Sequence, residues 1–459
     1  MTDNGLDMLY DNAAEIQVSS VYVKKDGNGS KSCTDSIAGA GDSVAGNNNG
    51  FLRGLDGIRA IACLGVIFHH FAQKLSPQIR PAFIREIGSF LLMGNSGVSV
   101  FFVLSGFLLS YPFWKRFLDG GEFPDMKQYA LRRAARIMPG YYVSFLVCSL
   151  LIPVFHVSTR DFWIRALAGL TFTAGFSYRT FFPNEINGPF WSVSFEVFCY
   201  MLMPVFMYAM FSVIRKKRTF LKAVAFWAGA AVLIVVLNKS IHIFLTPDNV
   251  QRGWQFGMTG GAKYWMPNYN PIGFFEHFTI GIISSGAAAR LFKASGPTED
   301  FRKKGGFDII CILGLSGSFA LLWFLRRAPE FSFSFQNQPY FFPFFALLIG
   351  ITLVAAPHSL FAGKLLDNAF FRFTAKVSFG LYIWHYVIMF IASNTVFRTY
   401  QNFSMMNLQE WALICLVVLA VSYGAAALSY RFIEKPVLDR AHKKTGGAHV
   451  MRHSQRQSM

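Results

Sequence analysis

Several ionisable residues lie within one apolar stretch near the start of the sequence. From position 52 the chain reads LRGLDGIRAIACLGVIFHH, which includes Asp56, Arg59, His69 and His70. Such groups are costly at membrane depth and usually serve a function there. A helix turns about 100° per residue, so Arg59 and His70 lie roughly 20° from one stripe and about 16 Å apart along the axis. The spacing favours a reactive imidazole inside the membrane, with a polar end nearer one surface.

A second apolar stretch holds a single carboxylate. Glu196, in WSVSFEVFCY, is the only charge between Trp191 and Ile214. A lone carboxylate there needs a partner or a proton. Its depth is similar to that of His70, so we expect the two to form a general base and the carboxylate that orients it. A structural hydrogen bond between helices is the alternative.

Two arginines are spaced to share a helical face. Arg133 and Arg136, in YALRRAARIMP, stand at i,i+3 just before an apolar run. Each guanidinium can grip phosphate oxygens through two hydrogen bonds, so the pair suits a phosphate-rich ligand from the cytosol. A topological anchor on lipid headgroups is the alternative and, from spacing alone, the simpler one.

The remaining polar candidates are less specific. Glu276 and His277 are adjacent, so at most one of them faces any given site. His385 stands alone in SFGLYIWHYVIM, where a packing histidine and a ligand contact are both open. Ser105 adjoins Gly106, which favours close helix packing, and we do not expect it to be a nucleophile.

The elements that must position these residues are membrane helices. Hydrophobic residues make up 53% of the 459 and charged residues only 15%, too apolar for a soluble fold of this size. Apolar runs predict an all-α bundle of ten spans: Gly57–Phe71, Gly88–Phe113, Met138–Phe155, Trp191–Ile214, Leu221–Leu237, Ile272–Ala289, Phe307–Leu325, Asn337–Ala356, Val377–Val396 and Trp411–Tyr430.

Charge distribution predicts the orientation of this bundle. With the N-terminus inside, the inner segments hold 30 Lys and Arg and the outer segments 12, so both termini are expected in the cytoplasm. The apolar run from Ala166 to Tyr178 is short, and we expect it to be re-entrant or interfacial. The first fifty residues are rich in Gly, Asn, Ser and Asp and are expected to be disordered.

The cysteines do not indicate a metal centre or a disulfide framework. Five of the six lie in apolar runs at irregular spacings, which is typical of small buried core residues: Cys63, Cys148, Cys199, Cys311 and Cys415. No metal and no tightly bound cofactor is therefore expected. No internal repeat is visible, which weakens a transporter built from inverted repeats.

Six motifs resemble, in order, those of the membrane acyltransferase-3 family. They are LDGIRAIACLGVIFHHF, VSVFFVLSGFLLS, RRAARIMPGYY, WSVSFEVFCY, SFGLYIWHY and YRFIEKP, and they run from about Leu52 to Pro436. The resemblance divides the chain into a cytoplasmic tail (1–50), a membrane acyltransferase domain (51–436) and a basic cytoplasmic tail (437–459). No hydrolase-like extracellular domain is expected after Pro436.

The resemblance implies an enzyme of about ten spans. Such an enzyme takes an acyl group, most often acetyl, from cytosolic acyl-coenzyme A as co-substrate and delivers it to a hydroxyl of a carbohydrate, lipid-linked or small-molecule acceptor. The family's arginine and histidine match Arg59 and His70, and its paired arginines match Arg133 and Arg136. Val197 stands where many members have a second acid after the position of Glu196, which departs from the family pattern.

Together these observations predict a division of roles. Arg133 and Arg136 hold the phosphates of the donor, with Arg59 beside the pantetheine or a phosphate. His70 accepts the proton of the acceptor hydroxyl, either directly or through an acyl-histidine, and Glu196 orients it. Asp56, Glu276, His385 and Ser105 are possible lining residues. Membrane lipids are expected partners and nucleic acid is not.

Two other classes of protein also place charges in a membrane. A polytopic transporter of a small polar substrate would carry His, Glu and Arg at similar depth but would perform no acyl chemistry. A scaffold or receptor would use the same groups as ties between helices, so that their loss would affect folding and not activity. Only the enzyme releases free thiol from acetyl-coenzyme A.

Overall fold

The described part of the chain is helical throughout. The structure is a computed structural model that describes residues 53–76, 78, 82–245, 257–327, 342–398 and 405–444. Within those ranges the chain forms no strand, and its one β-bridge joins Leu75 to Met405. The predicted all-α class is therefore confirmed. The predicted disordered tail before residue 50 lies outside the described residues.

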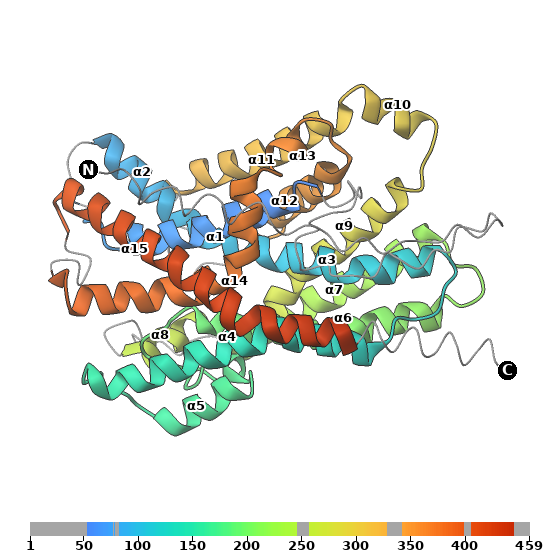
Figure 1. The fold of residues 1–459 in the computed structure, drawn as a ribbon. Helices are drawn as coiled ribbons and strands as arrows, with labels where there is room; N and C mark the ends of the chain where they lie inside the picture. The colour runs from blue at the N-terminus through green and yellow to red at the C-terminus, as the bar shows by residue number, and fades with distance from the viewer. Residues whose placement is uncertain are drawn as a thin grey trace, which may run out of the picture. The chain divides into compact units, whose positions relative to one another are not determined.

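Helices of very different length follow one another along the chain (Figure 1). The first half contains α1 (Leu55–Ala72), α2 (Ala82–Leu92), η4 (Met93–Ser96), α3 (Gly97–Leu118), α4 (Met126–Val154), α5 (Phe162–Leu170), η5 (Ala174–Phe176), α6 (Phe190–Val213) and α7 (Phe220–Leu245). The second half contains α8 (Gly257–Trp265), α9 (Pro271–Leu291), α10 (Pro297–Lys303), α11 (Gly306–Leu325), α12 (Phe344–Ala355), η8 (Ala356–His358), α13 (Ala362–Leu365), α14 (Ala369–Asn394), α15 (Leu408–Ser429) and the π-helical η10 (Tyr430–Glu434).

Nine helical segments of the described chain are long and apolar enough to cross a membrane. They correspond to nine of the ten predicted spans and show a multi-pass bundle. The eighth prediction, Asn337–Ala356, differs: the described helix there runs only from Phe344 to His358, and residues 337–341 lie outside the described part.

Several boundaries also differ from the predicted ones. The second apolar segment extends from Ala82 to Leu118 and is interrupted by η4. Helix α4 begins twelve residues before the predicted Met138, because Asp125 caps it by accepting hydrogen bonds from the backbone of Lys127 and Gln128. At the other end of the chain, the expected tail from 437 begins as helix and continues to Lys444.

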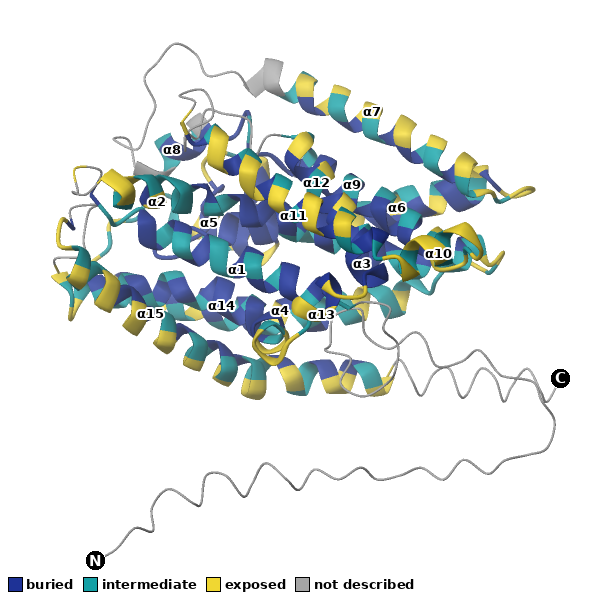
Figure 2. Ribbon diagram, turned by 90° about the horizontal axis from the view of Figure 1, so that it is seen from above, coloured by how far each residue is buried: buried dark blue, intermediate teal, exposed yellow. Residues whose placement is uncertain are grey.

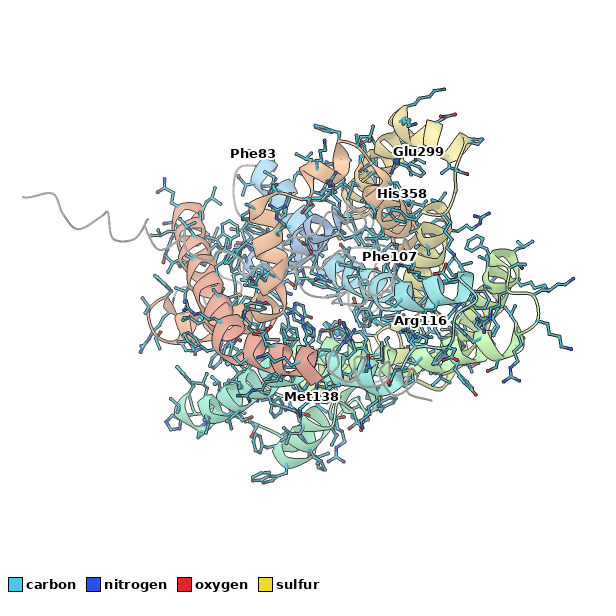
Figure 3. All side chains as sticks on the ribbon, turned by 45° about the vertical axis from the view of Figure 1, so that its right-hand side comes forward. Phe83, Phe107, Arg116, Met138, Glu299 and His358 are labelled. Carbon is cyan, nitrogen blue, oxygen red and sulfur yellow. The ribbon has the colours of Figure 1, made fainter. Side chains whose placement is uncertain are left out.

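The interior of the bundle is formed by α1, α3 and α9. The apolar window of α9 is 78% buried and that of α1 61% buried, whereas α7 and α11 are only 22% buried. Figure 2 shows the same contrast, with exposed residues along the outer sides of α7, α11 and α15. In Figure 3, Phe107 of α3 lies inside the bundle, while Met138 lies at its periphery. The exposed sides are apolar, as contact with lipid requires.

Helices α3 and α9 approach each other closely at two glycines. A Cβ on Gly106 would collide with the carbonyl of Phe278, and one on Gly281 would collide with the carbonyl of Val103. Close contact of this kind is how membrane helices gain packing energy. The close backbone approach expected at Ser105–Gly106 is confirmed, and it sets the position of Ser105 in the bundle.

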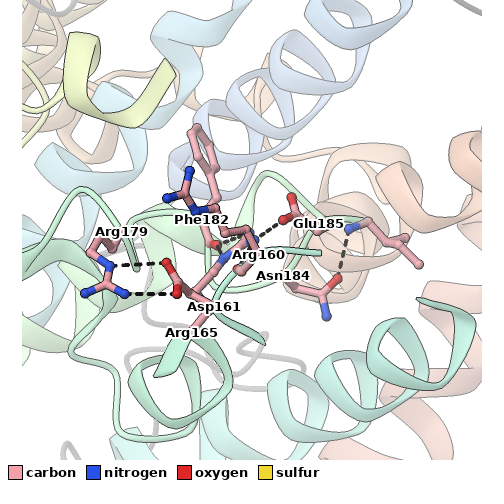
Figure 4. A network of polar contacts seen from close by, with 8 residues as sticks. Arg160, Asp161, Arg165, Arg179, Phe182, Asn184 and Glu185 are labelled. Atoms are coloured by element: carbon pink, nitrogen blue, oxygen red, sulfur yellow. Dashed lines mark hydrogen bonds and ion pairs between the residues drawn. The ribbon is translucent and has the colours of Figure 1, made fainter. Parts of the chain in front are cut away.

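The segment between α4 and α6 does not cross the bundle as a helix. Its longest helix, α5, has nine residues, and the exposed side chains of Trp163 and Leu167 give it an apolar outer face of the kind an interfacial helix presents. The buried Arg165 ties α5 to the following loop, because its Nε donates to the carbonyl of Phe182 at 2.7 Å and its guanidinium pairs with Glu185 (Figure 4).

A second ion pair supports the same segment. Arg179 donates to Asp161 at 2.9 Å, and this hydrogen bond lowers the pKa of the Asp161 carboxyl (Figure 4). Further along, the side chain of Asn187 donates to the carbonyl of Ile383 on α14 at 2.8 Å. The loop is thereby fixed to α14 just before α6 begins, which fixes the start of the helix that carries Glu196.

Candidate active site

One pocket gathers polar residues from five helices. Residues of α1, α3, α4, α6 and α14 line this pocket. Its polar lining consists of Arg59, Ser105, Arg133, Arg136, Ser192, Glu196, Tyr200, Ser378 and Tyr382. Five of the residues proposed from sequence therefore share one cavity.

The paired arginines lie on the pocket side of α4, as their spacing predicted. Arg136 Nη1 lies 3.7 Å from Glu434 Oε2, and the Glu434 side chain is completely buried. Arg133 forms no ion pair within 4.0 Å in the described part of the chain. A guanidinium without a carboxylate partner, at the wall of a cavity, is suited to an anionic ligand.

Glu196 lies at the centre of a small hydrogen-bond network. It accepts a hydrogen bond from Ser105 Oγ at 3.2 Å and a short one from the hydroxyl of Tyr200. It also interacts electrostatically with Arg59 and Arg136. The Glu196 carboxylate therefore lies on the side of the pocket that contains Arg59 and Arg136.

A second hydroxyl pair lies on another wall of the pocket. Ser192 Oγ and the Tyr382 hydroxyl are 2.5 Å apart, and Tyr382 also donates to the carbonyl of Pro189 at 3.4 Å. Both tyrosines of the lining, Tyr200 and Tyr382, were absent from the candidates predicted from sequence. Tyr200 is at i+4 from Glu196, and Tyr382 is at i−3 from His385, so helical spacing could have found each of them.

His70 lies in a separate cluster beside the pocket. Its ring stacks on that of His385 at a centroid distance of 5.3 Å and meets the edge of Tyr386 at 4.9 Å. Its Nδ1 lies 3.1 Å from Gln73 Oε1. His70 is half-buried and faces α14, not the lipid side of the bundle, while His385 is fully buried.

The expected pairing of His70 with Glu196 is not found. Among the described residues no hydrogen bond joins them, and His70 does not line the pocket that contains Glu196. The physical reason is that the helices carrying the two residues pack against different neighbours. Helix α1 packs on α3 and α14, whereas α6 packs on α3 and α9. Similar depth in the membrane therefore did not bring the two side chains together.

The other candidates fall on different sides of their helices. Asp56 interacts electrostatically with Arg59 but does not line the pocket. Glu276 accepts from Asn238 on α7 at 3.0 Å, and His277 contacts Ser99 on α3 at 2.8 Å. Adjacent residues thus diverge as expected, and neither of the two lines the pocket.

The described cysteines are all free thiols in the interior. The five are Cys63, Cys148, Cys199, Cys311 and Cys415. Cys63 lies between Arg59 and His70 on α1, and its Sγ donates to the carbonyl of Ser378 at 3.5 Å. This contact holds α1 against α14 between the pocket and the histidine cluster.

The chain is similar to one family model and to several known proteins. The family model described as "Acyltransferase domain" matches residues 52–427. The peptidoglycan O-acetyltransferase OatA of Listeria monocytogenes is 23% identical over 84% of this chain and 56% of its own length. The O-acetyltransferase OatA of Staphylococcus aureus strain NCTC 8325 is 25% identical over 86% of this chain and 58% of its own length.

These matches cover only part of each relative. The chain spans a little over half the length of the curated relatives it matches, so the similarity concerns one part of those proteins. A putative O-acetyltransferase of S. aureus strain COL gives the same picture, at 25% identity over 84% of this chain and 57% of its own length. No solved structure matches.

Proposed function

The chain belongs to the acyltransferase-3 family, and we propose that it moves an acetyl group from cytosolic acetyl-coenzyme A to a hydroxyl of a carbohydrate, lipid-linked or small-molecule acceptor. The observation that carries this proposal is the cluster of Arg59, Arg133 and Arg136 around one pocket. The donor carries several phosphates, which guanidinium groups bind through paired hydrogen bonds. The names of the relatives favour acetyl as the acyl group and a carbohydrate as the acceptor.

Arg133 is proposed as the first contact of the donor phosphates. Arg59 already interacts with Asp56 and Glu196, and Arg136 is compensated by Glu434. Arg133 lacks such an ion pair within the described residues and lies one helical turn from Arg136. A phosphate between the two arginines would receive two charge-assisted contacts at the least desolvation cost.

His70 is proposed as the general base. The acceptor oxygen bonds to the thioester carbonyl carbon while His70 takes its proton; the carbon–sulfur bond then breaks, and the coenzyme A thiolate leaves with the proton that His70 returns. Tyr382 lines the pocket and precedes His385, which stacks on His70, by three residues on α14. The acyl arm of the donor would follow this helix from the arginines to the imidazole. An acyl-histidine intermediate is the alternative.

The orientation proposed from the charge distribution is consistent with these roles. With both termini in the cytoplasm, the segment before α4 is cytoplasmic and Arg133 and Arg136 face the donor's compartment. A cysteine-reactive, membrane-impermeant label tests it. Cys introduced at exposed Lys443 should be labelled only after the membrane is opened, and labelling in intact cells would reverse the topology.

The decisive experiment measures thiol release by the purified full chain in lipid nanodiscs. With labelled acetyl-coenzyme A and a panel of glycan and polyol acceptors, we expect acceptor acetylation and stoichiometric release of coenzyme A. A transporter would bind or move a substrate without releasing thiol. Mass spectrometry of surface glycans and small metabolites from cells with and without the protein then identifies the acceptor by the loss of one acetyl unit.

A matched pair of arginine variants tests the donor site. Arg133→Ala should raise the KM for acetyl-coenzyme A, because it removes a phosphate contact. Arg132→Ala should not, because Arg132 is on the same helix but does not line the pocket. An unchanged KM in Arg133→Ala would remove Arg133 from the donor site.

His70→Ala tests the base. General-base catalysis is typically worth on the order of 10² to 10⁴ in rate, so we expect turnover to fall at least a hundredfold while the protein still folds. Parental turnover by His70→Ala protein present at normal levels would show that another group takes the proton.

A further inference from the structure

Three side chains connect the end of α1 to α2 through consecutive hydrogen bonds. His69 Nδ1 lies 2.6 Å from the carbonyl oxygen of Leu92, the last residue of α2. Gln73 Nε2 lies 3.1 Å from His69 Nε2, and Gln73 Oε1 lies 3.1 Å from His70 Nδ1. Gln73 therefore bridges the two adjacent histidines, one of which is the proposed base.

The contacts from the Leu92 carbonyl through His69 and Gln73 to His70 form a hydrogen-bond relay. The direction of each bond in it follows from the bond between His69 and the carbonyl. A carbonyl oxygen can only accept, so His69 carries a proton on Nδ1. His69 is only 4% exposed, and burying a charged ring is costly, so the neutral form with a lone pair on Nε2 is favoured. That lone pair must accept from the amide nitrogen of Gln73.

The same logic then fixes the state of His70. If the Gln73 amide nitrogen faces His69, its oxygen faces His70 Nδ1, and that nitrogen must donate a proton. In a neutral imidazole one nitrogen donates and the other accepts, so Nε2 of His70 holds the lone pair.

We propose that Gln73 is the positioning residue of the reaction, holding His70 as the tautomer whose Nε2 can accept the acceptor's proton. The proposal rests on the proposed function, because only a base needs a free lone pair. Gln73 would supply what a carboxylate supplies to the histidine in many hydrolases, namely orientation and tautomer, without adding a charge inside the membrane.

The backbone around the relay is held in place by packing. Gly94, two residues after Leu92, lies so close to the carbonyl of Gly65 that a Cβ would collide with it, which fixes η4 against α1. Gln73 caps α1: its backbone N–H donates to the carbonyl of His69 at 3.1 Å, and the next N–H, of Lys74, donates to the carbonyl of Phe71 at 3.0 Å. Trp411 of α15 donates to the same Phe71 carbonyl at 2.9 Å. The relay thus lies between three fixed helices.

The test compares two substitutions of Gln73 in the full chain in nanodiscs. Gln73→Met keeps the length of the side chain but removes both polar atoms. We expect kcat to fall about tenfold, the equivalent of one hydrogen bond, with the KM for acetyl-coenzyme A unchanged. Gln73→Glu still accepts from His70 Nδ1 and should restore kcat to within a few-fold of the parent.

Controls separate positioning from a general loss of structure. Ser318→Ala removes a buried hydroxyl whose hydrogen bond, within the described residues, goes to the carbonyl of Gly314 on the same helix α11, and it should leave kcat unchanged. In the His70→Ala background, Gln73→Met should cause no further loss, because residues that act as one unit are not additive. Parental kcat in Gln73→Met, or a further loss in the double variant, would overturn the proposal.

A measurement independent of turnover covers the case in which the proposed function fails. Nitrogen NMR of ¹⁵N-histidine protein distinguishes a protonated ring nitrogen from one with a lone pair, and the His70 signals are assigned by difference from His70→Ala. We expect a protonated Nδ1 and a bare Nε2 in the parent, and a mixture of tautomers in Gln73→Met. A proton on Nε2 in the parent would refute the relay, whereas full activity of His70→Ala would refute only the role of His70 as base.

Discussion

Arg136 of α4 and Glu434 of the π-helical turn after α15 meet at 3.7 Å at the edge of the pocket, although they are 298 positions apart in the sequence (434 − 136). Ser429 donates to the other carboxylate oxygen of Glu434 at 3.2 Å, which orients the acid. A π-helical turn is uncommon and is often found at functional sites. Here it places a fully buried carboxylate behind one of the proposed phosphate-binding arginines.

Glu434→Gln should destabilise the free protein and leave Arg136 free for a donor phosphate. Removing one partner of a buried ion pair leaves the other charge uncompensated, which costs roughly 3 kcal/mol. We expect a lower melting midpoint and a lower KM for acetyl-coenzyme A, because the carboxylate no longer competes with a donor phosphate for Arg136, with kcat little changed. Coenzyme A should recover part of the lost midpoint, because its phosphate replaces the carboxylate beside Arg136. A midpoint that falls but does not respond to coenzyme A would separate Glu434 from the donor site.

Arg133→Lys should impair donor binding even though the charge is kept. A guanidinium binds phosphate with two parallel donors, whereas an ammonium is a point charge on a flexible chain. We expect the KM for acetyl-coenzyme A to rise by roughly tenfold, about one charge-assisted hydrogen bond. Equal KM values for Arg133→Lys and the parent would mean that charge alone attracts the donor.

Gly281→Ala should prevent normal folding, because its Cβ would collide with the carbonyl of Val103 at the α3–α9 contact. Gly229→Ala is the matched control: Gly229 is also inside a helix, α7, but a Cβ there meets nothing within 4 Å. Alanine favours helix by up to about 1 kcal/mol over glycine, so the control should be as stable as the parent or more so. The yield of monodisperse protein after detergent extraction distinguishes the two outcomes.

The sequence predicted features that depend on position along a single helix. Arg133 and Arg136 were placed on one face by their i,i+3 spacing, and both line the pocket. The divergence of Glu276 and His277 follows from the same geometry and is confirmed. Apolar length was enough to find nine of the ten spans, because the thickness of the bilayer sets that length.

Features that depend on which helices are neighbours could not be predicted in the same way. The pairing of His70 with Glu196 was inferred from depth, but depth does not say that α3 is a neighbour of both α1 and α6. Glu434 lies within the motif YRFIEKP, which indicated the family but no role for this residue, and its approach to Arg136 depends on the packing of η10 on α4. Gln73 could have been noticed at i+3 from His70.

Because His70 and Glu196 are separate in the structure, substitutions at the two positions should change the kinetics independently. The pairing expected from sequence predicts the opposite. Glu196→Gln keeps an acceptor for Ser105 and Tyr200 but removes the charge that interacts with Arg59 and Arg136. We expect it to change the KM for acetyl-coenzyme A. The fold-change should be the same in the parent and in His70→Ala protein, since sites without shared partners act independently. If Glu196→Gln lowers kcat in the parent and has no effect once His70 is alanine, the two residues act as one unit, as the pairing expected from sequence requires.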